Sequence, residues 1–168
     1  TVTLLSSGVA IGTTTANGDG QFSITTSTLA DNTYSLTVTA TDAAGNISAA
    51  SDALSMTVDA TAPAQPAITT TTTLTSDATP TIEGTAEAGS TVTLLSSGVA
   101  IGTTTANGDG QFSITTSTLA DSNYVLTVTA TDAAGNISDA SSALNLTVDT
   151  TCLLYTSDAA DDTWCGVV

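Results

Sequence analysis

The sequence predicts an all-β protein built from tandem antiparallel β-sandwich repeats with a period of 90 residues. Residues 1–31 recur unchanged at residues 91–121. Apolar residues alternate with threonine and serine, as in strands with one buried face. Clusters of turn-forming residues separate these runs at the close spacing expected of a sandwich. No segment has helical periodicity, so we expect no helix.

The internal repeat predicts three parts of the chain. Residues 1–60 differ from residues 91–150 at eight positions. We interpret residues 1–60 as a truncated repeat that lacks its first strands, and residues 61–150 as a complete repeat. Residues 151–168 do not continue the pattern and are interpreted as a non-native tail. We expect the truncated repeat to have an open sheet edge and an incomplete core.

Alternation within the complete repeat predicts its strands and its core. The stretch "YVLTVTATD" at 124–132 alternates apolar residues with threonine, as in a half-buried strand. Seven strands are predicted, at residues 66–74, 79–85, 90–97, 99–105, 110–116, 123–131 and 142–149. The residues predicted to be buried are Phe112, Ile114, Tyr124, Leu126, Val128 and Leu146.

Two tyrosines predict that the sandwich is immunoglobulin-like. Tyr34 and Tyr124 each open the sixth strand of their repeat, three residues after "LAD". Immunoglobulin-like domains keep a tyrosine there, and its hydroxyl bonds back to the preceding corner. We therefore expect both phenols to be structural and not to stack on carbohydrate.

The charge of the chain limits its partners. It has no lysine, arginine or histidine, and its 16 acidic residues give a formal charge of −16. Binding to nucleic acid or to an anionic membrane needs cationic side chains, so neither is expected. No apolar run is long enough to span a bilayer. Without an imidazole base, a lysine or an arginine, we predict that the protein is not an enzyme.

Calcium is the predicted partner of these carboxylates. Oxygen ligands without histidine favour calcium over zinc or copper. If the strands alternate in direction, acidic loops of the complete repeat meet at the end where the chain enters it, facing acids of the preceding repeat. The predicted ligands are Asp31, Asp59, Glu87, Asp109, Asp132 and Asn136. The alternative is that "NGDG" and "DAAGN" only form turns.

Three motifs in residues 1–150 resemble bacterial immunoglobulin-like repeats of giant surface adhesins. They are "TVDATAPAQP" at 57–66, "TPTIEGTAEAGSTVTL" at 79–94, and "TATDAAGNIS" at 39–48 and 129–138. The resembling proteins include biofilm-associated proteins and type I-secreted, calcium-binding adhesins. The resemblance implies a secreted stalk or adhesive array on the bacterial surface, in contact with neighbouring repeats of its own chain. Nothing in the sequence identifies an adhesive target.

Two functions in different classes remain open. A structural extender predicts interchangeable repeats without a unique surface, whereas a module that binds carbohydrate or ice predicts an exposed cluster that does not repeat. No such cluster precedes residue 151. The five threonines Thr69 to Thr73 would suit an ice-facing array, but we interpret them as an edge strand.

The tail from Cys152 has a different composition from the repeats. It contains both cysteines and the only tryptophan of the chain. One choice of codons for residues 152–161 reproduces the transposase adapter of a common short-read sequencing library. We therefore interpret this tail as translated adapter DNA. The alternative is a C-terminal cap closed by a disulfide between Cys152 and Cys165.

Overall fold

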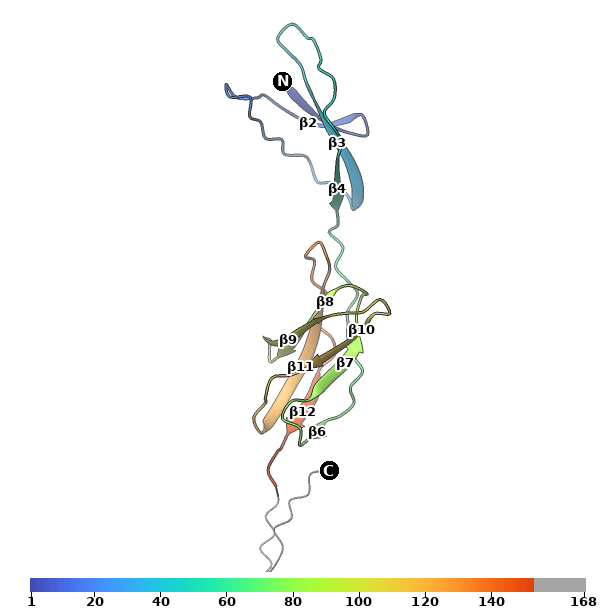
Figure 1. Cartoon of the computed structure of the whole chain (residues 1–168), viewed down its shortest axis with the longest axis vertical. Coiled ribbons are helices and arrows are strands. Elements are labelled where there is room, and N and C mark those ends of the chain that lie inside the picture. The colour runs from blue at the N-terminus through green and yellow to red at the C-terminus, as the bar shows by residue number, and fades with distance from the viewer. Residues whose placement is uncertain (153–168) are drawn as a thin grey trace, which may run out of the picture. The chain divides into compact units, whose positions relative to one another are not determined.

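A computed structural model describes residues 1–152 of the chain, which form two compact units. Unit 1 comprises Thr1–Thr61, and unit 2 begins at Ala62 (Figure 1). Within the described residues the secondary structure consists of strands and turns, and no helix there could span a membrane. From residue 153 onward, the tail predicted to be non-native lies outside the described residues.

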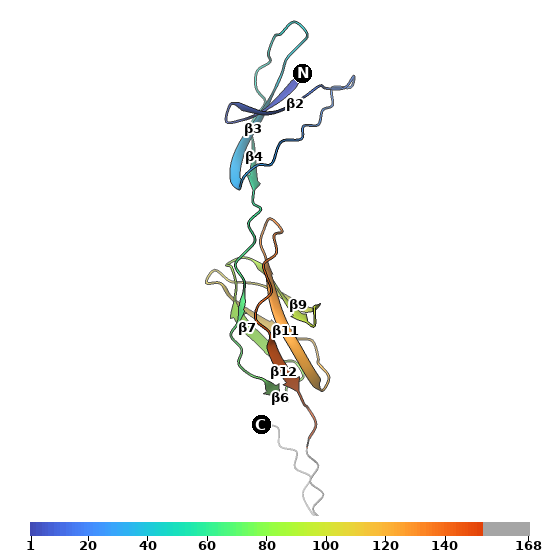
Figure 2. The same cartoon turned by 180° about the vertical axis from the view of Figure 1, so that it is seen from behind.

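Unit 2 is a sandwich of two sheets. One sheet has the order β10-β7-β5, and the other has the order β6-β12-β11-β8-β9 (Figures 1 and 2). The strands are β5 (Ala67–Ile68), β6 (Leu74–Thr75), β7 (Thr81–Thr85), β8 (Thr91–Ser96), β9 (Val99–Thr105), β10 (Gln111–Thr115), β11 (Ser122–Thr131) and β12 (Leu144–Val148). This architecture confirms the predicted all-β fold.

One predicted strand is wrong. The strand expected over 66–74 is two short strands, with Thr69 to Thr73 between them. β5 pairs with β7 antiparallel, whereas β6 pairs with β12 parallel in the other sheet (Figure 2). The threonine run therefore crosses from one sheet to the other and is not an edge strand. Thr70 fixes this crossing, because its hydroxyl accepts the Glu83 amide at 2.8 Å.

The core of unit 2 lies between the two sheets and follows the predicted alternation. Five of the six residues predicted to be buried are at most 5% exposed, and Tyr124 is partly buried against them. The fully buried side chains also include Ile82 on β7 and Val92 and Leu94 on β8. Each comes from an apolar position in an alternating strand, as expected for one buried face per sheet.

Both tyrosines make the predicted corner contact. The Tyr124 hydroxyl donates to the Ala120 carbonyl at 2.9 Å, and the Tyr34 hydroxyl donates to the Ala30 carbonyl at 2.8 Å. Each bond satisfies the polar end of a ring that packs at the start of a long strand. The immunoglobulin-like geometry is thus present in both units.

Unit 1 has only one of the two sheets. Its strand order is β2-β1-β3-β4, the counterpart of β9-β8-β11-β12 in unit 2. Residues 21–25, identical in sequence to β10, form no strand, because residues 1–61 contain no counterpart of β7 to pair with them (Figure 1). The strands are β1 (Val2–Ser6), β2 (Val9–Thr14), β3 (Asn32–Ala40) and β4 (Leu54–Val58).

Candidate functional site

Three acidic loops lie at one end of unit 2. The pairing register sets Thr91 opposite both Thr105 and Thr131, and sets Gln111 opposite Thr85. The loops that follow β7, β9 and β11 therefore meet at the same end. These loops contain Glu87, Asp109 and Asp132 with Asn136. β5 also begins there, since Ala67 pairs with Thr85, so this is the end where the chain enters unit 2.

Asp132 organises the loop after β11. One carboxylate oxygen accepts the amides of Ala134 and Asn136 at 2.8 and 2.9 Å, and the other accepts the Asn136 side-chain amide at 2.8 Å. The Asn136 side-chain bond is the main reason that the pKa of Asp132 lies below its usual value. Asp42 and Asn46 repeat the arrangement in unit 1, and the pKa of Asp42 is lowered by the same contact. Both pairs thus have the turn-forming role that was the alternative to metal binding.

The loop after β9 is held by an asparagine. The Asn107 side-chain oxygen accepts the amides of Asp109 and Gln111 at 3.0 and 2.8 Å. This bond pattern is an Asx turn, which leaves the Asp109 side chain on the exposed rim of the loop. Glu87 is also exposed, while Ser90 in its loop is buried and donates to the Glu87 carbonyl. The carboxylates of Asp109 and Glu87 therefore reach solvent from two adjacent loops.

Asp31 ties down the segment that leaves unit 1. Its carboxylate accepts the Ala60 amide at 3.0 Å and the Thr61 hydroxyl. Asp59 accepts the Thr61 amide at 3.1 Å. The Thr61 hydroxyl is the main cause of a lowered pKa for Asp31. We call the contact of this aspartate with the residues after the last strand the exit clasp.

Unit 2 has the same exit clasp, which the sequence analysis missed. Asp121 accepts the Thr150 amide at 3.0 Å and the hydroxyls of Thr150 and Thr151 at 2.7 Å each. The Thr150 hydroxyl is the main cause of a lowered pKa for Asp121. Asp149 accepts the Thr151 amide at 3.0 Å, as Asp59 does for Thr61. The recurrence of "LAD" and "TVD" at a fixed separation in both repeats was the available signal.

The six predicted calcium ligands are thus distributed over both units. Glu87, Asp109, Asp132 and Asn136 lie at the end where the chain enters unit 2, and Asp31 and Asp59 lie where the chain leaves unit 1. Among residues 1–152, no three acidic, thiol or imidazole groups cluster closely enough to hold a metal ion.

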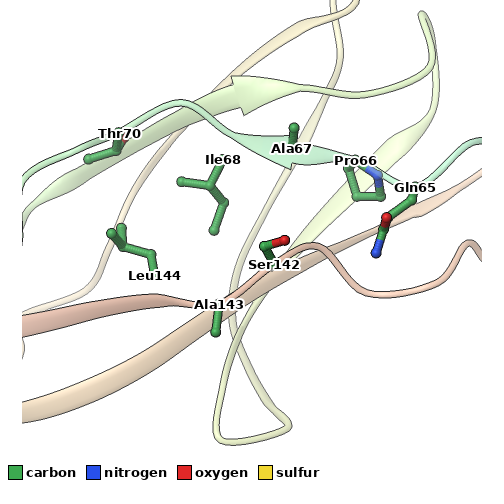
Figure 3. Close-up of a pocket in the computed structure, with 8 residues that line it drawn as sticks. All are labelled: Gln65, Pro66, Ala67, Ile68, Thr70, Ser142, Ala143 and Leu144. Carbon is green, nitrogen blue, oxygen red and sulfur yellow. The ribbon is translucent and has the colours of Figure 1, made fainter.

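A hollow at the edge of the unit 2 sandwich has the wrong chemistry for a sugar site. It has a volume of about 340 Å³ and lies between β5 and the start of β12, with Ile68 and Leu144 among its lining residues (Figure 3). None of the eight residues that line it is aromatic or charged. A sugar ring would find no aromatic face to stack on there.

The Asp132 loop gives a pH-dependent prediction. A folded-state pKa below the unfolded value stabilises the protein above about pH 4, and this stabilisation is lost as the pH falls through the folded pKa. Wild type should therefore be more stable than Asp132→Asn near neutral pH, and the gap should shrink below about pH 4. Chemical denaturation across this pH range measures the gap. The general self-repulsion of the acidic chain is nearly common to both proteins, so a gap that does not shrink in acid would contradict the assignment.

Comparison with known proteins identifies the fold family. The sequence model of the bacterial Ig-like domain matches residues 1–60 and again residues 64–150. The chain belongs to the bacterial Ig-like domain family. Both units are therefore Ig-like domains, and the two matched segments correspond to the two copies of the internal repeat. No curated protein matches the sequence.

Two solved structures show how the bacterial Ig-like chain compares with known folds. The fibronectin(III)-like modules of Clostridium thermocellum CbhA are 16% identical, with a TM-score of 0.56 over 95% of this chain and 83% of that structure. That likeness supports the β-sandwich fold. The BSP domain of a biofilm associated protein is 26% identical, with a TM-score of 0.44 over 90% of this chain. The present chain spans 25% of the length of that structure.

Proposed function

We propose that the chain is a structural extender: a stalk segment of a secreted bacterial surface adhesin that supports cell adhesion or biofilm formation. The observation that supports this most strongly is the exit clasp, which recurs in both units on the residues that lead out of the last strand. A domain that works singly has no need to hold its outgoing segment. A domain in a tandem array needs that segment held, because it sets where the next domain begins.

The near identity of the units supports the same proposal. Residues 1–60 and 91–150 differ at eight positions, and five of these lie in β3, β4 or their copies. A stalk needs interchangeable segments, whereas a binding module needs a surface of its own. We assign no catalytic role to either unit.

Calcium completes the proposal as the ion that stiffens each junction between repeats. The charge of −16 has no lysine, arginine or histidine to balance it, so carboxylates brought together at a junction repel one another. A calcium ion takes six to eight oxygens and would convert that repulsion into coordination. The acids at the outgoing end of one unit, Asp31 and Asp59, and at the incoming end of the next, Glu87, Asp109 and Asp132, would supply the ligands.

Calorimetric titration of calcium into the whole chain tests this proposal. We expect binding with a dissociation constant on the order of 10⁻⁴ to 10⁻³ M, as in extracellular calcium modules. The double variant Asp59→Ala/Asp132→Ala should lose it. Asp19→Ala is the matched control, because Asp19 is the unit 1 copy of Asp109 but lies at the end of unit 1 opposite to Asp31. Equal binding by all three proteins, or none by wild type, would refute the calcium assignment.

A further inference from the structure

The loops that follow β9 and β11 have the same backbone bonding. In each loop the side-chain oxygen of the first residue accepts the amides two and four residues further on, and its carbonyl accepts the amide three residues on. The fourth residue, Gly110 or Gly135, has a positive φ. The first residue is Asn107 in one loop and Asp132 in the other. The turn therefore accommodates either a side-chain amide or a carboxylate at its first position.

Asn107 is followed by a glycine, and so is Asn17, its copy in unit 1. No other asparagine of the chain precedes a glycine. The backbone nitrogen of the next residue can attack the side-chain carbonyl carbon of an asparagine when no side chain blocks its approach. Both asparagines are exposed, and a Cβ atom built at Gly108 or Gly18 would meet no atom within 4 Å beyond the neighbouring residues. The approach to both side chains is therefore sterically open.

The amide nitrogen of Gly108 is available for this attack. Among residues 1–152, no backbone or side-chain acceptor takes its N–H, whereas the amides of Asn107, Asp109 and Gly110 are all bonded within the turn. Closing a ring at the Gly108 nitrogen consumes an N–H that holds no part of the turn.

The side-chain oxygen of Asn107 lies where it can carry a negative charge. Attack on the carbonyl carbon turns this oxygen into an oxyanion. The amides of Asp109 and Gln111 already donate to it at 3.0 and 2.8 Å. Preorganised backbone donors at about 2.7 to 3.1 Å are the arrangement that stabilises the oxyanion of an acyl transfer. The Asn17 side-chain oxygen has the same two donors in unit 1, at 3.0 and 2.8 Å.

We propose that this turn promotes the deamidation of its own asparagine, at Asn107 and at Asn17. The glycine nitrogen forms a bond to the side-chain carbonyl carbon, and the side-chain nitrogen takes up the glycine amide proton and leaves as ammonia. Water then adds to the same carbon and breaks its bond to the glycine nitrogen, which regains a proton. The product is aspartate, which the turn accommodates, since Asp132 and Asp42 occupy the same position in the loops after β11 and β3.

Each conversion adds a carboxylate to the folded chain without a modifying enzyme. In unit 2 the new carboxylate lies two residues before Asp109, at the end where the chain enters the unit. The chemistry depends neither on calcium nor on the stalk function, so its test stands apart from theirs.

The test incubates the freshly purified whole chain near neutral pH and follows it by ion-exchange chromatography and intact mass. Wild type should gain two negative charges, one for each Asn-Gly pair, each with the mass change of an amide replaced by a carboxylate. Asn107→Asp should gain one charge, and Asn17→Asp/Asn107→Asp should gain none over the same period. No gain by wild type, or an equal gain by the double variant, would overturn the proposal.

A synthetic peptide of residues 103–113 separates the turn from the dipeptide, because it keeps Asn-Gly but does not hold the two donors in place. The folded Asn17→Asp chain should convert at Asn107 several-fold faster than this peptide does in the same buffer. Adding Gly108→Val should nearly abolish conversion, since the branched side chain blocks the nitrogen while the open space around Gly108 preserves the fold. Conversion of the peptide at the same rate or faster, or isoaspartate as the main product of the folded chain, would overturn the role of the turn.

Discussion

Replacing Phe112 with alanine should lower the free energy of unfolding of unit 2 by about 3 to 5 kcal/mol. The Phe112 ring is 5% exposed and packs against the β7 backbone at Gly84. Its removal takes away buried apolar surface and leaves a cavity between the sheets. Hydrogen exchange at the Leu126 amide reports the loss, because Leu126 is fully buried on the central strand β11.

The control for this prediction is the same substitution in the other unit. Phe22 has the same neighbours in sequence, but no β7 strand covers it within residues 1–61, and it is 48% exposed. Phe22→Ala should therefore change the stability of unit 1 by no more than about 1 kcal/mol. Equal costs in the two units would mean that the covering strand does not distinguish them.

Replacing Gly84 with valine should destabilise unit 2 by about 3 kcal/mol, through overpacking. Local strand preference predicts the opposite, because valine favours strands and glycine does not. The Cβ of valine would collide with the Ala67 carbonyl and the Phe112 ring, so β5 must separate from β7 or the ring must move.

Gly108→Ala is the control for this substitution. No atom outside the neighbouring residues lies within 4 Å of a Cβ built at Gly108, and it sits in the turn after β9. Its replacement should shift the midpoint of chemical denaturation very little. A Gly84→Val protein as stable as wild type would show that β5 and β7 do not pack as closely as described.

Alternation of apolar and polar residues predicted most of the fold, and the exceptions have physical causes. The pattern placed Leu126, Val128 and Leu146 in the core, because each lies on a strand that has one buried face and one solvent-exposed face. The crossing at Thr69 to Thr73 was not visible in the pattern. Threonine is equally compatible with either sheet, so the sequence does not show where the strand predicted over 66–74 ends. Its second part, β6, is set by parallel pairing with β12, which is a contact between residues far apart in the sequence.

The candidate site was less predictable than the fold. Sequence reasoning chose Asp31 but not Asp121, although both hold their exit segments through the same threonine contacts. Asp121 lies far from the junction between the two units, whereas the contact that it makes recurs within both units. The role of Asp132 as a turn former could be anticipated from "DAAGN", since aspartate and asparagine at that spacing bond to the same short loop.

The most direct test of calcium stiffening needs two complete repeats, so that missing strands are not mistaken for a flexible junction. Two copies of residues 62–151 joined in tandem supply this, with Asp149 of the first copy in the position of Asp59. Small-angle scattering should show a longer and narrower particle in calcium than in chelator. Asp149→Ala in the first copy with Asp132→Ala in the second should remove the difference. If wild type scatters identically in both buffers, calcium does not stiffen the junction, and these acids serve only the turns and exit clasps that they form within each unit.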